Sequence, residues 1–408
     1  MKIAMISLRD NPLTALNDTD SAGGRRHVAE LSQELRKLGH ELTVYTRQTD
    51  RRLPDRMRVD RGFDVVHVAA GPAEKLGDDD VVPHIGEFAR SLSARWADDA
   101  PDVIHAHHWT SGLGAVLSAR RTAIPIVQSY HGLVGGASTE IERLVGRGAA
   151  GVIATSGQEA DELARLGVRR SRISTVPWGV DTETFTPTGP ATARTGRLRV
   201  LAAAQLAPDD GLDDLVLALT AVSNTELVVG GGPARRFLRG NAEYERLTDL
   251  ATRHAVADRV SFLGHVPHSE MPALIRSADV VACPQRQMSF GVVALEAMAC
   301  GVPVVATAVG GLAESVVHQV TGLLVPPHNP AMLARALRAL LVDEVRRQQL
   351  GAAGQDRVHI RYAWDRVALD VERAYHRAAG PELITAQRTP AQVYARLRQA
   401  LTRDEPSV

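Results

Sequence analysis

Short apolar runs alternate with longer amphipathic stretches over most of the 408-residue chain. This alternation is typical of parallel α/β sheets, in which buried strands are joined by helices. The apolar runs of the first half are predicted to be strands at 3–7, 41–46, 64–68, 102–106, 124–128 and 150–154. Apolar residues recur at helical spacing from Val28 to Leu38, so a helix is expected over 24–38, stopping at Gly39.

A Pro-, Gly- and Thr-rich segment, TPTGPATARTG at 186–196, is predicted to be a linker. The alternation restarts after it, with strands predicted at 197–204, 226–230, 259–264, 278–283, 302–307 and 322–326. We therefore expect two Rossmann-like lobes, 1–190 and 191–361, with the helices of 362–408 following the second pattern. Open parallel sheets bind ligands at the carboxyl ends of their strands, so the cleft between the lobes is the expected site.

Composition and charge exclude several classes of protein. A content of 44% hydrophobic and 23% charged residues is that of a soluble globular protein. The formal net charge is zero, which gives no overall field for nucleic acid or an anionic membrane. Lysine is scarce, because only Lys2, Lys37 and Lys75 occur and the other 44 of the 47 basic residues are arginine.

The two cysteines and the N-terminus favour a cytoplasmic protein. Cys283 and Cys300 lie in apolar runs without metal-ligand spacing, so both are expected to be reduced core residues. The N-terminal run MKIAMISL is too short for a signal sequence, and no stretch approaches the length of a membrane span. The sequence leaves open whether the chain forms a homo-oligomer.

The segment 284–311 carries the strongest chemical signal. A strand is followed by a loop and by a helix that begins near Gly291. The backbone N–H groups of Gly291, Val292 and Val293 are free at such a helix start and suit a phosphate. Glu296 lies one turn further on the same side, where its carboxylate can accept hydrogen bonds from ribose hydroxyls. The alternative is a capped helix with a solvated glutamate.

Motifs spread along nearly the whole chain resemble those of one enzyme family. In order they are AGG (22–24), HAHHW (105–109), SYHG with its His131, VPWGVDTETFTP (176–187), LVVGGGP (227–233), FLGHVP (262–267), ADVVACP (278–284), FGVVALEAMACGVPVVATAVGGLAESV (290–316) and TGLLVPP (321–327). On these motifs the chain resembles the retaining glycosyltransferases of family GT4. Segments GHELTVYTR and HAHHW are most similar to the branch containing sucrose-phosphate synthase and D-inositol 3-phosphate glycosyltransferase. The resemblance implies a GT-B fold, with two Rossmann-like lobes facing across a cleft and a C-terminal helix, carrying Trp364 and Tyr375, that crosses back to the first lobe.

The resemblance also implies roles for single residues. Glu296 matches the glutamate that holds the nucleotide ribose, and His131 matches the histidine that contacts the donor sugar near the reacting carbon. The remaining donor-side matches are the glycine loop and the start of the later helix, at Gly23, Gly24, Ser289, Phe290, Gly291, Val292 and Val293. In such enzymes the departing phosphate takes the acceptor proton, so no protein nucleophile, metal or cofactor is expected beside the nucleotide sugar. The acidic runs at 17–20 and 77–81 are then expected to be solvated loops.

The sequence departs from the family pattern where the donor diphosphate is clamped. Gln205 stands in place of the family's arginine, and Asp210 in place of its lysine. Because charge-assisted hydrogen bonds contribute about 1.5–3 kcal/mol each, losing two weakens diphosphate binding by roughly two to four orders of magnitude. Arginines that are candidates to compensate are Arg25, Arg235, Arg236 and Arg286.

Met288 is a further departure, in the donor-sugar pocket. It occupies the position of a glutamate, eight residues before Glu296, that holds sugar hydroxyls in the family. Methionine offers no strong acceptor and presents an apolar, adaptable surface. The substitution predicts an unusual donor sugar that is deoxygenated, alkylated or extended.

The predicted acceptor site, with His107, His108 and Gly132, departs from the pattern as well. His108 replaces a tyrosine and Gly132 replaces a threonine, both of which contact phosphate in the inositol-phosphate branch. Transfer to inositol phosphate is therefore not expected. His105 and His107 could form a metal pair, but their alternation at a strand end favours positioning or core roles.

The residues that match the family and those that depart from it leave two main hypotheses for the function. The leading hypothesis is a metal-independent retaining glycosyltransferase that acts on a small acceptor in specialised metabolism. The alternative is a catalytically silent GT-B protein that binds a ligand or partners an active enzyme, since three site residues are changed together. A phosphorylase of the same fold is less favoured, because it needs cations to hold free phosphate.

Overall fold

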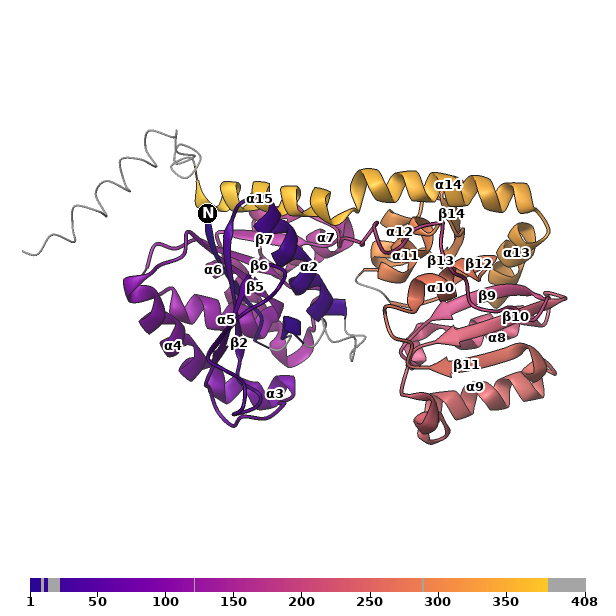
Figure 1. The fold of residues 1–408 in the computed structure, drawn as a ribbon, viewed down its shortest axis with the longest axis horizontal. Coiled ribbons are helices and arrows are strands. Elements are labelled where there is room, and N and C mark those ends of the chain that lie inside the picture. The colour runs from indigo at the N-terminus through magenta and orange to yellow at the C-terminus, as the bar shows by residue number, and fades with distance from the viewer. Residues whose placement is uncertain (9–10, 14–22, 121, 288–289, 381–408) are drawn as a thin grey trace, which may run out of the picture.

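The computed structural model describes residues 1–8, 11–13, 23–120, 122–287 and 290–380. Two α/β lobes, each built on a sheet of mostly parallel strands, lie side by side along the long axis of the molecule (Figure 1). The first has eight strands in the order β3-β4-β2-β1-β5-β6-β7-β8, and the second has six in the order β11-β10-β9-β12-β13-β14. The expected pair of Rossmann-like lobes is confirmed.

The first lobe contains every strand predicted for the first half of the chain. Its strands are β1 (Lys2–Ile6), β2 (Glu41–Arg47), β3 (Arg56–Arg58), β4 (Asp64–Val68), β5 (Val103–His107), β6 (Ile126–Ser129), β7 (Gly151–Ala154) and β8 (Ile173–Thr175). Its helices are α2 (Gly23–Lys37), α3 (Asp78–Val81), α4 (Ile85–Asp98), α5 (His108–Ser118), α6 (Thr139–Gly148) and α7 (Gly157–Leu166). Strand β3 pairs antiparallel with β4, whereas the other pairings are parallel. The pattern of apolar runs missed only the two three-residue edge strands, β3 and β8.

The second lobe is an all-parallel sheet covered by helices. Its strands are β9 (Leu198–Ala203), β10 (Thr225–Gly230), β11 (Val260–Gly264), β12 (Val280–Cys283), β13 (Val304–Thr307) and β14 (Gly322–Val325). Its helices are α8 (Leu212–Leu219), α9 (Ala242–Arg253), α10 (Met271–Arg276), α11 (Val292–Ala299), α12 (Gly310–Ser315), α13 (Pro330–Leu341) and α14 (Glu344–Arg361). Strands β12 and β13 are buried along their whole length, as expected for strands with a helix layer on each face.

The last described helix, α15 (Trp364–Ala379), returns to the first lobe and packs against α2 and β7. Helices α14 and α15 run end to end along one side of both lobes (yellow, Figure 1). An isolated β-bridge between Val180 and Ala363 joins the two chain segments that connect the lobes. The hydroxyl of Tyr375 lies 2.8 Å from Nδ1 of the fully buried His105 in β5. The predicted crossing of the C-terminal helix is confirmed.

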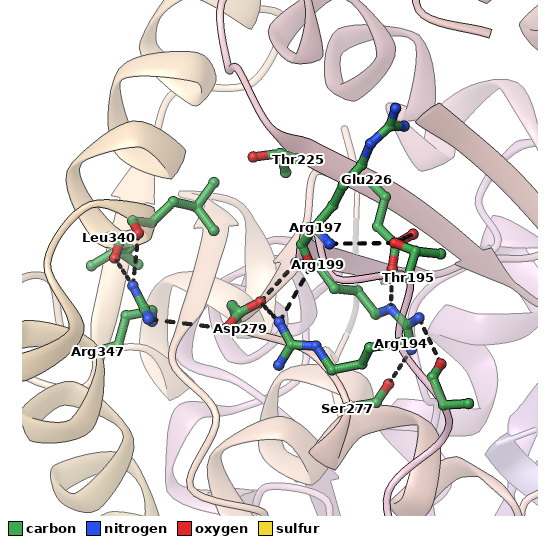
Figure 2. A network of polar contacts seen from close by, with 12 residues as sticks. Arg194, Thr195, Arg197, Arg199, Thr225, Glu226, Ser277, Asp279, Leu340 and Arg347 are labelled. Carbon is green, nitrogen blue, oxygen red and sulfur yellow. Dashed lines mark hydrogen bonds and ion pairs between the residues drawn. The ribbon is translucent and has the colours of Figure 1, made fainter. Parts of the chain in front are cut away.

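The predicted linker is held against the second lobe by a polar network (Figure 2). Arg199, at the start of β9, is 5% exposed and forms an ion pair of 2.7 Å with Glu226 of β10. Thr195 donates a 2.7 Å hydrogen bond to the other oxygen of Glu226, and Arg194 pairs with Asp279. These contacts lie at the amino ends of the strands, away from the cleft, and fix where the second lobe begins.

The two lobes also touch directly through helices α7 and α12. One carboxylate oxygen of Glu314 accepts a 2.7 Å hydrogen bond from the backbone N–H of Gly157. The backbone N–H of Gly310 donates to the side-chain oxygen of Gln158 at 3.1 Å. Each bond joins the first turn of a helix in one lobe to a side chain of the other lobe. Both bonds would have to break for the lobes to move apart at this place. Within the described part of the chain, every helix is too short or too polar to cross a lipid bilayer.

Candidate active site

A pocket of about 380 Å³ lies between the lobes at the carboxyl ends of their strands. The first lobe contributes α2 residues and the segment that leads to the linker; the second contributes the loops after β9, β10 and β12 and the start of α11. Residues of the sequence-predicted donor site that line this pocket are Gln205, Asp210, Phe290, Gly291, Val292, Val293 and Glu296. Segments almost 100 residues apart in sequence therefore meet at one place.

Helix α11 begins at the pocket wall without a side-chain cap at its N-cap residue, Gly291. The first backbone N–H to bond inside the helix is that of Ala294, which donates to the Gly291 carbonyl at 3.1 Å. The earlier N–H groups of Val292 and Val293 have no partner within the helix, as at any helix start. A side chain on Gly291 would overlap Leu312 of α12, so the close approach of α11 to α12 requires glycine here. This helix start suits a negatively charged ligand group.

Glu296 lies one turn along α11 and is 5% exposed. Burial raises the pKa of its carboxyl group to about 8, although the positive charge of Arg26 works against this rise. Nδ1 of His268 is 3.7 Å from one carboxylate oxygen. Near neutral pH this pKa favours the protonated carboxyl group, which can both donate to and accept from ligand hydroxyls.

Asp210 has a structural partner inside its own loop. Its carboxylate accepts a 2.8 Å hydrogen bond from the backbone N–H of Ala207, and burial raises the pKa of the group. Next to this turn Leu206 adopts a left-handed backbone with φ 59°, and the exposed Gln205 precedes it. The position that carries a lysine in the family is thus used here to hold a turn, and the position of its arginine carries a neutral amide.

The arginines predicted to compensate for the lost clamp do not line the pocket. Arg286 forms a 2.7 Å ion pair with Asp213 and also donates to the carbonyl of Pro208, and it is not among the lining residues. Arg235 is exposed outside the lining, and the Arg236 guanidinium lies 4.8 Å from the ring centre of its neighbour Phe237. Among the described residues, the arginine that does line the pocket is Arg26 of α2.

A cluster of aromatic rings forms the first-lobe wall of the pocket. Trp178 donates its indole N–H to Nδ1 of His131 at 3.1 Å, and Nε2 of His131 lies 2.9 Å from Nδ1 of His107. Because indole can only donate, the proton of a neutral His131 belongs on Nε2, which then donates to His107. Burial lowers the pKa of His131 to about 3 and that of His107 well below the usual value, so both rings are neutral. His27, which lines the pocket, packs its ring 4.8 Å from that of His131.

Of the two residues predicted to be catalytic, Glu296 lines the pocket; His131 and the predicted acceptor residues His107, His108 and Gly132 belong to the first-lobe side and are not among the lining residues. His131 has a left-handed backbone with φ 60° at the end of β6, followed by Gly132 with φ 99°. The backbone N–H of Gly132 donates to Glu159 at 2.9 Å, and Nδ1 of His108 lies 3.2 Å from the Thr110 hydroxyl. A non-glycine residue held at positive φ is strained, and such strain is common at functional sites.

The structure also bears on the two candidate metal ligands, His105 and His107. His105 is fully buried and both its ring nitrogens have partners, the hydroxyls of Tyr375 and Ser129 at 2.8 and 2.9 Å. It is a core residue that ties α15 to the sheet, as the sequence favoured. His107 instead belongs to a group with His27 and His131 whose nitrogens lie within 4.8 Å of one another. Both nitrogens of His131 already take part in the hydrogen bonds described above, so a metal there would have to displace Trp178 or His107.

The remaining residues predicted for the donor site are not among the described residues that line the pocket. Gly23 and Gly24 form the first turn of α2 and lie outside the pocket lining. Met288 and Ser289 fall outside the described residues, as do Ala22 and the acidic run 17–20.

Several pocket residues were missed by sequence reasoning. Gln285 is the second residue after β12 and is 4% exposed, and its side-chain oxygen has no hydrogen-bond partner among the described residues. His265 and His268 come from the FLGHVPHSE segment, and His27 and Trp178 come from the first lobe. A signal existed for Gln285, because polar side chains at the carboxyl end of a buried strand face the ligand edge of a parallel sheet.

Two Rossmann-like lobes, a pocket between their carboxyl edges and a returning C-terminal helix define the GT-B class of glycosyltransferase folds. The family description "Glycosyltransferase Family 4" matches residues 21–184, and "Glycosyl transferases group 1" matches 190–357. D-inositol 3-phosphate glycosyltransferase from Xylanimonas cellulosilytica is 36% identical over 92% of this chain and 97% of its own length. The same enzyme from Kineococcus radiotolerans is 34% identical over 92% and 95%. The chain belongs to glycosyltransferase family GT4.

A solved structure supports the same fold assignment. Sucrose-phosphate synthase from Thermosynechococcus elongatus superposes with a TM-score of 0.81 and 27% identity, covering 95% of this chain and all of that chain. The likeness extends to both lobes and to the returning helix. The protein is therefore a glycosyltransferase, with the donor and acceptor still to be assigned.

Proposed function

We propose that this enzyme transfers a sugar, with retention of configuration, from a nucleoside-diphosphate sugar to a small-molecule acceptor. One observation carries the proposal: the buried carboxyl of Glu296 and the free start of α11 at Gly291 line one pocket between the lobes. A carboxyl group suits paired ribose hydroxyls, and a helix start suits phosphate. A nucleoside diphosphate presents both groups next to each other.

The chemistry would depend on positioning rather than on a protein nucleophile. The departing phosphate would take the proton of the acceptor hydroxyl as the new glycosidic bond forms on the same face of the sugar. Neutral His131, fixed by Trp178, would contact the donor sugar and keep its tautomer through the hydrogen bond from the indole. The reaction would be metal-independent, because both nitrogens of His131 are engaged and the chain's own N–H groups are available for the diphosphate.

The diphosphate would be held by less positive charge than in the family pattern. Arg26 is the arginine in the described lining, and it would supply one charge-assisted contact of about 1.5–3 kcal/mol. The helix start adds about 0.3–2 kcal/mol. With Gln205 and Asp210 in place of two cations, donor binding is expected to be weak and to require contacts from the sugar itself.

The sugar is proposed to be deoxygenated, alkylated or extended. Met288 replaces the glutamate expected to hold sugar hydroxyls, which removes a strong acceptor. The unpartnered oxygen of Gln285 in the same pocket would accept one hydrogen bond from the sugar. One acceptor in place of a carboxylate suits a sugar with fewer hydroxyl groups at that end.

The acceptor is proposed to be a small molecule of specialised metabolism other than inositol phosphate. His108 and Gly132 stand where the relatives named for inositol phosphate are expected to carry a tyrosine and a threonine. Gly132 has no side chain, and its N–H is already bonded to Glu159. His108 lies next to Thr110. Neither position supplies the hydroxyl that would hold the acceptor phosphate.

A titration of the purified protein with UDP, GDP, ADP and dTDP tests the site. One of these nucleotides should raise the melting temperature, since a ligand at 100 times its Kd stabilises by about 2.7 kcal/mol. Glu296→Ala should abolish the shift, while Glu270→Ala, an exposed glutamate outside the lining, should retain it. No shift with any nucleotide, or a shift that survives Glu296→Ala, would contradict the assignment.

Turnover separates the enzyme from a silent GT-B protein, the alternative that the changed Gln205, Asp210 and Met288 favour. Nucleotide release from a panel of deoxy, methylated and common nucleotide sugars should be fastest with a modified sugar. Met288→Glu should move the preference toward common hexoses. If the native protein prefers UDP-glucose or UDP-N-acetylglucosamine, the proposal of a modified sugar is wrong. Nucleotide binding without release from any donor and acceptor pair would favour the silent protein.

A further inference from the structure

A second hollow, of about 660 Å³, lies where the chain crosses from the second lobe back to the first. Its walls are the end of α14, one face of α15, and residues 175–177 after β8. It shares no lining residue with the cleft pocket. We refer to it below as the crossing hollow. A volume of this size matches that of small-molecule sites in proteins.

The crossing hollow is strongly basic, although the whole chain has no net charge. Its lining includes five arginines, Arg357, Arg361, Arg366, Arg373 and Arg377, and one acidic residue, Asp370. The lining thus has a formal charge of +4. The three arginines on α15, at 366, 373 and 377, are spaced by seven and four residues, which places them on one face of that helix. A concentration of like charge in a concave site attracts anions.

Three of these arginines, Arg357, Arg361 and Arg377, contact no carboxylate among the described residues. Arg361 packs against the ring of Tyr362, 5.9 Å from its centre, and Arg377 donates to the hydroxyl of Ser174 at 2.7 Å. Arg373 pairs at 2.7 Å with Asp370, the acidic residue of the lining, so among the lining residues no further carboxylate faces Arg361 or Arg377. The exposed guanidinium groups of Arg361 and Arg377 are therefore available to an anionic ligand.

The remaining arginines have different contacts. Arg357 donates to the carbonyls of Ser315 and Glu314 at 2.9 and 2.8 Å, which fixes one wall of the hollow. Arg366 lies 3.8 Å from Asp365, with both side chains more than half exposed, so this pair is weak.

The crossing hollow joins elements of both lobes. Arg361 is on α14, which packs against α11 of the second lobe, whereas Arg377 is on α15, which packs against α2 and β7 of the first. Arg361 is the last residue of α14, whereas Arg377 lies 13 residues into α15, so the two arginines are well apart along helices that run end to end (Figure 1). A single phosphate reaches one such guanidinium, so a ligand with more than one phosphate fits the arrangement better.

We propose that the crossing hollow binds a small molecule carrying two or more phosphate groups. The planar fork of arginine matches phosphate oxygens in pairs, and several arginines around one concave site are suited to a multiply charged anion. A small molecule fits better than a membrane surface, because the guanidinium groups surround a hollow. This site is independent of the proposed donor site, and a failure of either leaves the other testable.

Isothermal titration calorimetry with inorganic pyrophosphate tests the proposal on the full chain. The wild-type protein should bind pyrophosphate, and the double variant Arg361→Gln/Arg377→Gln should bind at least tenfold more weakly. A matched loss of two exposed charges on α13, Arg335→Gln/Arg338→Gln, should leave the affinity within twofold of wild type. Arg26→Gln in the cleft should also retain binding at the crossing hollow.

Three results would overturn the proposal. The first is an affinity that is unchanged in Arg361→Gln/Arg377→Gln, or no binding by the wild type. The second is a loss of binding in Arg26→Gln alone, which would put pyrophosphate in the cleft. The third is sedimentation of the protein with phosphatidylglycerol vesicles through Arg361 and Arg377 while pyrophosphate neither binds nor competes, which would make the surface a membrane contact. Unfolding of the double variant is checked by its circular dichroism; if it is unfolded, Arg377→Gln alone replaces it in the same comparison.

Discussion

At the scale of single residues, burial of Glu296 makes the folding stability depend on pH. Its pKa of about 8 lies above the ordinary value for glutamate, so the folded protein holds a proton that the unfolded chain releases. Folding stability should therefore fall as the pH rises from about 4.5 through 8. Glu296→Gln keeps the shape of the side chain without a charge and should raise the free energy of unfolding at pH 8 by about 1–3 kcal/mol.

Thermal unfolding at pH 5 and pH 8 measures this effect. The stabilisation by Glu296→Gln should be nearly absent at pH 5 and should appear at pH 8, while nucleotide affinity falls. The exposed Glu270→Gln should change neither. An equal stabilisation at both pH values would show that the gain comes from packing and not from the proton.

A second residue-scale prediction concerns Gln205, whose exposed side chain lines the cleft pocket. Gln205→Arg would place a cation where the family has one and should tighten nucleoside-diphosphate binding by about tenfold, the effect of one charge-assisted contact. The gain should shrink as salt is added, because the new contact is exposed to solvent. Gln349→Arg, on an exposed surface of α14, is the matched control and should have no effect.

Site residues could be predicted from the sequence where the residues that define their role are close to them in the chain. Glu296 and Gly291 are five residues apart at the start of one helix, so their shared placement followed from the pattern of 284–311. Arg286 is instead neutralised by an ion pair with Asp213, more than 70 residues away in the sequence. No local pattern around Arg286 indicated this pairing. Gln285 had a local signal in its place after a buried strand, but that its side-chain oxygen is buried without a partner depends on the folded surroundings.

At the scale of elements, the start of α11 should tolerate little change. A methyl group on Gly291 would overlap Leu312 and push α11 away from α12. Gly291→Ala should destabilise the protein by about 1–3 kcal/mol, as overpacking does, and should weaken nucleotide binding because the N–H groups at the helix start move. Urea unfolding and nucleotide titration measure the two effects.

Gly240→Ala provides the matched control for this element. A methyl group there would meet no atom within 4 Å, so both stability and affinity should stay near wild type. If Gly291→Ala is destabilised but binds nucleotide normally, the helix start is not part of the binding site.

The elements themselves could largely be predicted from the pattern of apolar runs. Strands such as β12 and β13 are buried on both faces, and an apolar run is the direct result of such burial. Strands β3 and β8 were missed because they are three residues long and include exposed positions at the sheet edges. The segment 186–196 was correctly expected to separate the two sheets, but its anchoring by Arg199 and Glu226 requires distant partners.

At the scale of the whole molecule, the bond between Tyr375 and His105 holds the returning helix on the first lobe. Both side chains are fully buried, so Tyr375→Phe would leave a ring nitrogen of His105 without a partner. This should lower the free energy of unfolding by about 1–3 kcal/mol. Chemical denaturation measures the change, and Tyr244→Phe, whose ring is partly buried in the second lobe, should have a smaller effect. Equal losses in the two variants would contradict a special role for the bond.

The same returning helix sets an order for synthesis on the ribosome. The first lobe emerges first, yet the ring of Tyr375 that completes its core lies 270 positions after His105. The second lobe, from β9 to α14, is continuous in sequence and can finish folding while the first still exposes the apolar surface that Trp364 and Val371 will cover. The half of the enzyme that is made first is therefore the half that is finished last, and until then its uncovered surface is a target for chaperones.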